Sequence, residues 1–357
     1  MKILYILTSY NLYGGTPKKT LDLIETLGGK ACLYVYENKR NEFKYRFINT
    51  GATIYEGFYR RNLYRHLRAL LKIVDEEKID IVQTQFSMGE TLGYLIKMFR
   101  PKIKLIIAIV GTNKPTFPKN ILIPLFYRKV DHVIFVSKYA QYAKIKQFPI
   151  LKSKSNSIIY NGTKIRENNG EIIPILNKTS ILGIGYLAEW KNLNVLIETM
   201  NILINRNNYT KVYLYLAGDG PLKEKLNADI RNYTLDQNVF LLGCQSNIGA
   251  LLQSCDIFVH PCNIEAFGIA VTEAMMAKKP IIVSDAGALP ELIQNNYSGL
   301  IVSHKDPNAW AGAILHLINN PDFAATLAQN AQKKALEDFT VENFTNNYLR
   351  LYKNIVD

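Results

Sequence analysis

The sequence predicts an α/β protein with two doubly wound domains, each built around a parallel sheet. Strand-like and helix-like segments alternate along all 357 residues, 48% of which are hydrophobic. This alternation is typical of parallel sheets with crossover helices. The length is sufficient for two separate cores. A polar segment without periodicity at residues 161–170 contains two glycines and is the best candidate for a linker between the halves.

Each expected element follows from the hydrophobic pattern of its segment. In the first half, we expect strands at residues 2–8, 31–36, 79–83, 104–110, 132–136 and 157–160, and helices at 17–27, 63–76, 89–100 and 138–148. In the second half, we expect strands at 180–185, 211–217, 239–242, 257–260, 280–284 and 299–302, and helices at 193–205, 222–232, 268–277, 307–318 and 321–338. The segment 341–356 is amphipathic. The expected domains are 1–165 and 166–338, with a final helix in 339–357 that packs back toward the first domain.

The composition argues against several classes of protein. The apolar run at residues 2–7 is short and lacks a small-residue cleavage site, so it predicts an opening strand and not a signal peptide. No apolar segment reaches the roughly 18 residues that a membrane-spanning helix requires. The four cysteines show no paired metal-ligand spacing, and we expect them to be buried side chains in a reduced, cytoplasmic protein (Cys32, Cys244, Cys255, Cys262).

The net charge of +13 is unevenly distributed. Residues 1–170 carry 29 Lys and Arg against 12 Asp and Glu, a net charge of +17, whereas the remaining residues carry 14 against 18, a net charge of −4. The basic half therefore predicts an anionic partner, and charge alone leaves nucleic acid, anionic lipid and a phosphorylated acceptor open. Nucleic acid is not an expected partner, because the sequence shows no recognition-helix, RNA-binding or base-stacking motif.

The segment after the expected strand at 257–260 carries the strongest functional signal. Glu265 lies in the loop, and Glu273 lies about one and a half turns into a helix that begins near Gly268. Backbone N–H groups at such a helix start bind phosphate or sugar hydroxyls readily. Each carboxylate can accept hydroxyl hydrogen bonds without a metal. The pattern therefore predicts a site for a ligand that is rich in hydroxyl groups.

This segment resembles the retaining glycosyltransferases of family four, which have the GT-B fold. The resemblance rests on the Glu-x7-Glu motif at Glu265 and Glu273 and on residues 183–192, 217–221, 280–291 and 298–302, so it covers nearly all of 180–302. It implies two facing Rossmann-like domains with a cleft between them.

The resemblance also implies roles for individual residues. Glu265 would bind hydroxyls of the transferred sugar, Glu273 would bind the ribose hydroxyls, and Lys191 would neutralise the diphosphate. Lys191 and Glu265 are therefore the expected catalytic residues. Further donor contacts would come from the backbone of Phe267, Gly268 and Ile269. We expect no metal or other cofactor, because the second half has no Asp-x-Asp motif at a strand end.

Two positions depart from the family pattern. Tyr186 replaces a diphosphate-binding Arg, and as a donor-site residue it can donate one hydrogen bond but carries no charge at neutral pH. Val110 replaces a His that lines the sugar site. Retaining members are thought to let the leaving phosphate take the acceptor proton, which requires electrostatic stabilisation more than a base. None of the five histidines lies in an obvious replacement motif, so all are expected to be structural or solvated (His66, His132, His260, His304, His316).

The loop after the first strand is the expected contribution of the N-terminal half. Thr16 is the expected N-cap of a helix that starts at Pro17. By the resemblance, Gly15 would approach the donor phosphates. Acceptor contacts would come from this loop and from the end of the strand at 104–110, at Gly14, Lys18, Gly111 and Thr112.

The segment 63–72 predicts a basic amphipathic helix. Four cations are expected on one face and four leucines on another: Arg61, Arg65, Arg68 and Lys72, and Leu63, Leu67, Leu70 and Leu71. Such a helix suits an anionic membrane surface, and the alternative is an ordinary solvated helix. We therefore expect a cytoplasmic protein bound peripherally to the inner face of the membrane.

The expected activity is retaining transfer of a hexose-type sugar from a UDP-linked donor to a cell-envelope glycan or a lipid-linked acceptor. Two alternatives remain open at this point. One is a GT-B-like nucleotide-sugar epimerase or phosphorylase, and the other is a catalytically weak relative that serves as a scaffold.

Overall fold

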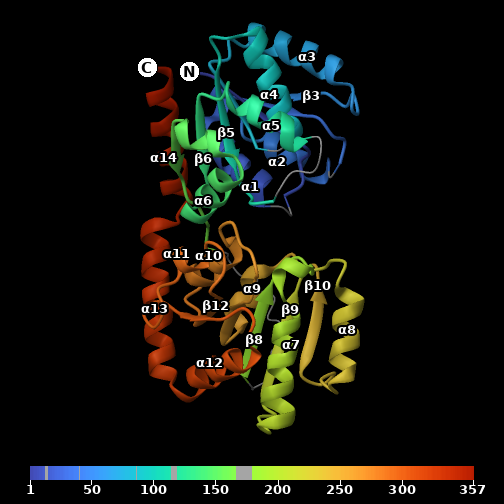
Figure 1. The fold of residues 1–357 in the computed structure, drawn as a ribbon, viewed down its shortest axis with the longest axis vertical. Coiled ribbons are helices and arrows are strands. Elements are labelled where there is room, and N and C mark those ends of the chain that lie inside the picture. Colours follow the sequence, from blue (N-terminus) through green and yellow to red (C-terminus); the bar gives the residue numbers. More distant parts are fainter. Residues whose placement is uncertain (13–14, 40, 86, 114–118, 166–178) are drawn as a thin grey trace. The chain divides into compact units, whose positions relative to one another are not determined.

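The computed structural model describes residues 1–12, 15–39, 41–85, 87–113, 119–165 and 179–357, which form two compact units (Figure 1). Unit 1 comprises Met1–Gly162 and Val341–Asp357, and unit 2 comprises Thr163–Thr340. Each unit has one all-parallel sheet with helices packed against it. The predicted fold class, two Rossmann-like α/β domains, is confirmed.

Unit 1 contains a seven-stranded sheet in the order β3-β2-β1-β4-β5-β6-β7. Its strands are β1 (Ile3–Leu7), β2 (Ala31–Val35), β3 (Thr53–Glu56), β4 (Ile81–Thr84), β5 (Lys104–Ile109), β6 (His132–Phe135) and β7 (Asn156–Ile158). Its helices are α1 (Gly15–Leu27), α2 (Lys44–Ile48), α3 (Leu63–Glu76), α4 (Ser87–Phe99), α5 (Lys119–Tyr127), α6 (Lys138–Gln147) and α14 (Val341–Val356), with 3₁₀ turns at Gly28–Lys30, Asn41–Phe43 and Pro149–Ser153.

The two faces of this sheet pack against different helices. Along β1, Ile3 and Tyr5 belong to the core cluster that includes α1 and α14, whereas Leu4 and Ile6 belong to the cluster that includes α3 and α4. This division follows from the alternation of side chains along a strand. Helix α14 is fixed by Tyr352, whose hydroxyl lies 2.9 Å from that of Tyr5 and donates to Gln83 of β4 at 2.6 Å. The last helix of the chain is therefore part of unit 1.

Unit 2 contains a six-stranded sheet in the order β10-β9-β8-β11-β12-β13. Its strands are β8 (Thr179–Ile184), β9 (Val212–Ala217), β10 (Val239–Gly243), β11 (Ile257–His260), β12 (Ile281–Ser284) and β13 (Leu300–Val302). Its helices are α7 (Asn194–Asn201), α8 (Lys223–Asn232), α9 (Ile248–Ser254), α10 (Ile269–Met276), α11 (Leu289–Leu292), α12 (Pro307–Asn319) and α13 (Pro321–Asp338). A 3₁₀ turn lies at Glu189–Lys191, and a π-helical turn at Ile202–Arg206 continues α7. Helix α12 packs against α7, and α10 packs against α13.

The order of strands reverses direction between β8 and β11 in unit 2. The chain builds β8, β9 and β10 toward one edge and then returns to place β11 on the other side of β8. At such a point the loops that follow two neighbouring strands run to opposite sides of the sheet, which leaves room for a ligand at the strand carboxyl ends. The fold therefore places the natural ligand site of unit 2 after β8 and β11.

Several elements differ from the sequence prediction. Strand β3 and helices α2, α5, α9 and α11 were not predicted, and β7 covers 156–158 instead of 157–160. Helix α1 begins at Gly15, so Thr16 lies inside the helix and the prediction that it is the N-cap is wrong. The carbonyl of Thr16 accepts a hydrogen bond from the hydroxyl of Thr20, one turn later in the helix, at 3.2 Å.

The basic helix also differs in detail from the prediction. Helix α3 covers Leu63–Glu76, and its N-cap is Asn62, whose side chain accepts a bond from the N–H of Arg65 at 3.0 Å. Arg61 therefore precedes the helix and is not on its face. Leu63, the first residue of the helix, was expected on the apolar face, but it is exposed. Within the described residues, no helix is both long and apolar enough to cross a bilayer.

Candidate active site

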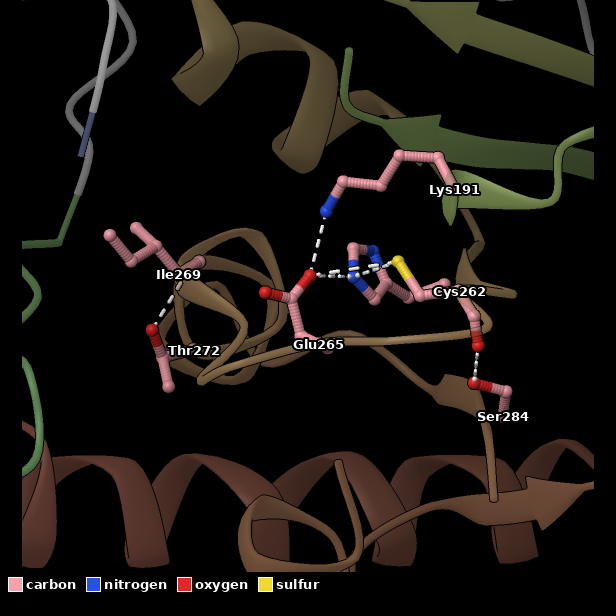
Figure 2. Close-up of polar contacts among 7 residues, drawn as sticks. Lys191, Cys262, Glu265, Ile269, Thr272 and Ser284 are labelled. Carbon is pink, nitrogen blue, oxygen red and sulfur yellow. Dashed lines mark hydrogen bonds and ion pairs between the residues drawn. The ribbon is translucent and has the colours of Figure 1, made fainter. Parts of the chain in front are cut away.

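Lys191 and Glu265 meet at the carboxyl ends of two adjacent strands. Lys191 lies in the 3₁₀ turn after β8, and Glu265 lies in the loop between β11 and α10. The ammonium Nζ of Lys191 donates to Oε2 of Glu265 at 2.6 Å (Figure 2). Their side chains are 18% and 16% exposed. The structure therefore brings together the two residues that the sequence predicted to be catalytic.

The turn that carries Lys191 is held by Asn192. This residue ends the turn with left-handed backbone, at φ 53°. Its side-chain amide donates to the carbonyls of Pro261 at 3.1 Å and His304 at 2.7 Å. The aliphatic stem of Lys191 lies over Gly185, where an added Cβ would come within 3.5 Å of it. These contacts direct the ammonium toward the loop after β11.

The backbone of Glu265 is fixed by the loop after β12. The N–H of Ala288 donates to the carbonyl of Glu265 at 2.9 Å. Gly287 has φ +64°, and a Cβ at this position would lie 2.3 Å from the Glu265 carbonyl oxygen. A side chain there would therefore be strained and would push the loop away. The glycine lets two loops pack closely enough to hold the carboxylate in place.

Two further side chains contact the same carboxylate, and the sequence analysis did not predict them. The Nε2 atom of His260 lies 3.0 Å from Oε2 of Glu265, and the Sγ atom of Cys262 lies 3.1 Å from that nitrogen and 3.6 Å from Oε2. His260 is 2% exposed, which is compatible with the expected structural role, and it lies at the end of β11 within hydrogen-bond distance of Glu265. Cys262 is buried as expected, but it belongs to a polar cluster. The spacing His-x-Cys-x2-Glu directly after a buried strand was the signal that could have revealed both.

The other cysteines and histidines have different environments. Cys244 is exposed, which corrects the prediction that every cysteine is buried. His66 is fully buried and bonds the Tyr34 hydroxyl at 2.8 Å. His132 bonds two serine hydroxyls at 2.9 Å each, in agreement with a structural role. The Nδ1 atom of His304 lies 2.7 Å from Oδ1 of Asp285, and both side chains are partly exposed.

The cluster strongly favours the ionised carboxylate. Burial opposes ionisation of Glu265, but the hydrogen bond from His260 and the charge of Lys191 outweigh it and hold the pKa of Glu265 well below its usual range. Burial likewise lowers the pKa of His260, but the Cys262 sulfur and the Glu265 carboxylate outweigh it and raise this pKa to about 9. Burial also opposes the charge of Lys191, yet Glu265 raises its pKa above the ordinary value. A carboxylate and an ammonium are therefore both present at neutral pH.

One oxygen of Glu265 remains available. Oε2 receives all the bonds described above, whereas no described residue donates to Oε1, which points away from the cluster (Figure 2). A carboxylate oxygen can accept two hydrogen bonds. Oε1 can therefore accept hydroxyl hydrogen bonds from a ligand.

Helix α10 begins close to Glu265. Its N-cap, Gly268, has left-handed backbone at φ 108°. The first N–H groups of a helix have no partner inside it and lie at its positive end. The side chain of Phe267 is buried against Phe339, so only its backbone can face a ligand, as it can at Ile269. Glu273 lies in the second turn of α10, as predicted, and is 6% exposed.

Tyr186 lies beside the site and has an aromatic neighbour. Tyr186 is 54% exposed, and the centroid of its ring is 6.0 Å from that of Trp190, which is also exposed. Trp190 directly precedes Lys191. The position where the family has a cation therefore presents a pair of exposed rings.

The predicted residues of the N-terminal half lie in unit 1. Gly15 is the first residue of α1, and Lys18 lies in its first turn. Gly111 and Thr112 lie in irregular backbone after β5. Gly14 lies outside the described residues. Their predicted contacts with donor and acceptor stay predictions.

Comparison with known proteins identifies the class of enzyme. The family model "Glycosyl transferases group 1" matches residues 166–334. An uncharacterized glycosyltransferase of Methanocaldococcus jannaschii is 26% identical over 374 residues, covering 100% of this chain and 99% of that protein. The N,N'-diacetylbacillosaminyl-diphospho-undecaprenol alpha-1,3-N-acetylgalactosaminyltransferase of Campylobacter jejuni is also 26% identical, covering 93% of this chain and 88% of that protein.

A solved structure confirms the fold. The chain is similar to Anabaena HepE in complex with UDP and glucose, with a TM-score of 0.85, 20% sequence identity, and coverage of 99% of this chain and 100% of that one. At this identity the likeness concerns the fold, which is the GT-B arrangement of two Rossmann-like domains. The protein is a glycosyltransferase with the GT-B fold, and its residues 166–334 match the group 1 glycosyl transferase model.

Proposed function

We propose that the protein transfers a hexose-type sugar, with retention of configuration, from a UDP-linked donor to a cell-envelope glycan or a lipid-linked acceptor. The observation that carries this proposal is the arrangement of Glu265. Three side chains fix one of its oxygens, and the other remains free to accept hydroxyl bonds. A rigidly held carboxylate beside a lysine suits a ligand that combines a sugar with a diphosphate.

The donor would engage unit 2 at three points. Oε1 of Glu265 accepts bonds from sugar hydroxyls, and Glu273 accepts bonds from the ribose. Lys191 and the first N–H groups of α10 meet the diphosphate. The UDP and glucose bound to the HepE structure support a UDP-linked donor.

Transfer would then use charge stabilisation without a metal. The bond from the sugar carbon to the phosphate oxygen breaks while the acceptor oxygen bonds to that carbon on the same face. The acceptor proton passes to the leaving phosphate, and the ammonium of Lys191 neutralises the remaining charge. A transfer assay in EDTA tests this point, and we expect the rate to equal that in magnesium or manganese. Activity that disappears in EDTA and returns with either ion would contradict the proposal.

The acceptor is proposed from the charge of the first half and from the relatives. The C. jejuni relative acts on a sugar linked to diphospho-undecaprenol. The net charge of +17 on residues 1–170 suits an acceptor that carries phosphate and lies at a membrane.

A surface of unit 1 supports peripheral attachment to anionic lipid. We call it the basic aromatic surface, and it consists of Phe58, Tyr59, Arg60, Arg61, Leu63, Tyr64, Arg65, Arg68 and Lys72, all of them exposed. The turn before α3, which belongs to this surface, is held by the buried His66. Its Nε2 atom lies 2.9 Å from the carbonyl oxygen of Arg60. Aromatic and basic side chains together favour the interface between lipid headgroups and acyl chains.

Two experiments test the proposal. The first identifies the donor, and the second determines the anomeric configuration of the product. A donor that binds only the native state raises the melting temperature. We expect a UDP-sugar to do so more than UDP alone. NMR of the product should show the anomeric configuration of the donor. Inversion would contradict the retaining mechanism, and epimerised sugar released without acceptor would favour an epimerase.

A further inference from the structure

His260, Cys262 and Glu265 form a compact triad of metal-ligating side chains. The three ligand atoms, Nε2, Sγ and Oε2, are separated by 3.0, 3.1 and 3.6 Å. All three atoms lie within 4.8 Å of one another, and Figure 2 shows the contact between the Cys262 thiol and a carboxylate oxygen of Glu265. His260 and Cys262 are buried, and Glu265 is partly accessible.

These separations match the requirements of zinc. Zn²⁺ takes sulfur at about 2.3 Å and nitrogen or oxygen at about 2.0 Å in tetrahedral geometry, which places ligand atoms roughly 3.3–3.5 Å apart. The observed distances depart from this by a few tenths of an ångström. Thiolate and imidazole ligands also favour Zn²⁺ over magnesium or calcium, which prefer oxygen.

The ligands are also held in place before any ion binds. The Ser284 hydroxyl donates to the Cys262 carbonyl at 2.6 Å, and the Ala288 N–H donates to the Glu265 carbonyl. His260 is the last residue of β11, a central strand of its sheet. Ion binding therefore requires little rearrangement of the backbone, which lowers its entropic cost.

We propose that this triad binds Zn²⁺ or a similar soft divalent cation through Oε2 of Glu265, and that the bound ion weakens donor binding because it draws charge from the carboxylate, so that Oε1 accepts sugar hydroxyl bonds less strongly. The Cys262 thiol and Nε2 of His260 lose their protons to solvent as the sulfur–zinc and nitrogen–zinc bonds form. The charge of the ion repels the ammonium of Lys191, which weakens the ion pair at Oε2. The fourth coordination position is left for water.

The binding of the ion depends only on the triad. Its inhibitory effect rests on the proposed function, since it requires that Glu265 bind the donor sugar. The two parts can therefore fail separately, and the experiment below distinguishes them.

The first measurement is a titration of the metal-free protein with Co²⁺, a spectroscopic substitute for zinc. We expect a thiolate-to-cobalt charge-transfer band and the intense visible bands of tetrahedral cobalt, saturating at one ion per chain and disappearing when Zn²⁺ is added. The Cys262→Ser variant should lose the charge-transfer band. The Cys244→Ser variant is the matched control, because it removes an exposed thiol from the same unit, and it should keep the band.

A second variant protects the test against a folding defect. His260→Gln should keep a thiolate band but bind zinc at least tenfold more weakly, since loss of a partner in the outer shell alone costs ten- to a hundredfold. Thermal melts in EDTA check that each variant is folded. The absence of a band in the wild type, or its persistence in Cys262→Ser, would overturn the metal site.

The second measurement is the binding of a UDP-sugar with and without Zn²⁺. We expect zinc to raise the apparent Kd at least tenfold in the wild type and to have no such effect in Cys262→Ser, which controls for zinc bound by the nucleotide itself. If cobalt binds the triad but zinc leaves donor binding unchanged, the metal site stands and the proposed weakening of donor binding is wrong. If cobalt does not bind, the metal site is wrong and the donor assignment is unaffected.

Discussion

The two units share one strand order but differ in the chemistry at the carboxyl ends of their strands. In unit 1, the hydroxyl of Thr8 lies 2.7 Å from that of Tyr36, after β1 and β2. The amide of Gln85, after β4, donates to the hydroxyl of Thr20 at 3.0 Å. These groups are neutral, and the carboxylate that ends the edge strand β3, Glu56, pairs with Lys44. Unit 2 instead gathers an ammonium, an imidazole, a thiol and a carboxylate after β8 and β11, at the place in its sheet that corresponds to β1 and β4. The shared topology fixes where a site can form, and the side chains decide what it does.

The ion pairs of the two units show the same contrast. In unit 1, Lys19 and Asp22 lie three residues apart in α1 with 3.0 Å between Nζ and Oδ2, and both side chains are less than 10% exposed. In unit 2, Lys191 and Glu265 are 74 residues apart, and a carboxylate oxygen remains available. A buried pair within one helix stabilises the fold, whereas a pair formed between two loops can separate when a ligand binds.

The largest expected effect is on the stability of unit 1. Asp22→Ala leaves the ammonium of Lys19 buried without its carboxylate, which should lower the free energy of unfolding by about 3–5 kcal/mol. The double variant Lys19→Met, Asp22→Leu removes both charges and should recover most of the loss. Urea denaturation measures both. An Asp22→Ala variant as stable as the wild type would show that this pair is not structural.

The second prediction concerns the charge of unit 1. Replacing Arg61, Arg65, Arg68 and Lys72 with Gln should release the protein from anionic vesicles, since each cation near the surface contributes about 1 kcal/mol that salt screens. Co-sedimentation at low and high salt measures the release. Donor binding by unit 2 should be unchanged.

A matched variant removes the same charge from exposed positions of unit 2, by replacing Lys211, Lys225, Arg231 and Lys278 with Gln. It should remain bound to the vesicles. Equal release of the two variants would show that net charge, and not the basic aromatic surface, drives attachment.

The third prediction concerns catalysis in unit 2. Glu265→Gln should lower the rate of sugar transfer on the order of 10²–10³-fold, because it removes a fixed charge from the reacting sugar. Because this variant also leaves the ammonium of Lys191 without its carboxylate, a thermal melt checks that it is folded at the assay temperature. Glu189→Gln is the control, because this exposed carboxylate lies in the same turn as Lys191 and should leave the rate unchanged. Transfer by Glu265→Gln at the wild-type rate would refute the role of this carboxylate.

The sequence predicted the buried parts of the fold better than its margins. Every residue of β1 and β2 is buried, so continuous apolar runs announce these strands. Strand β3 lies at the sheet edge, where half-exposed side chains give no such run, and it was missed. Helices α9 and α11 have seven and four residues, too few for a helical period to be recognised.

The sequence predicted only some residues of the site, because the others follow no motif that stands out from an ordinary core pattern. Lys191 and Glu265 were singled out through motifs that resemble those of a known family, although only the pairing of β8 with β11 brings them together. His260 and Cys262 were missed because a histidine at the end of a strand and a small buried cysteine each fit an ordinary core position. Their shared orientation toward Glu265 depends on the backbone of the loop, which periodicity does not describe.

In the proposed donor site of unit 2, Glu273 binds the ribose and Glu265 binds the transferred sugar. Calorimetric titration with UDP and with a UDP-sugar tests this assignment directly. Glu273→Gln should weaken the binding of both ligands by about 1.5–3 kcal/mol, because both carry the ribose. Glu265→Gln should weaken only the binding of the UDP-sugar. If the Glu273→Gln variant binds UDP as tightly as the wild type, or if the Glu265→Gln variant loses UDP and the UDP-sugar equally, this division of the donor site is wrong.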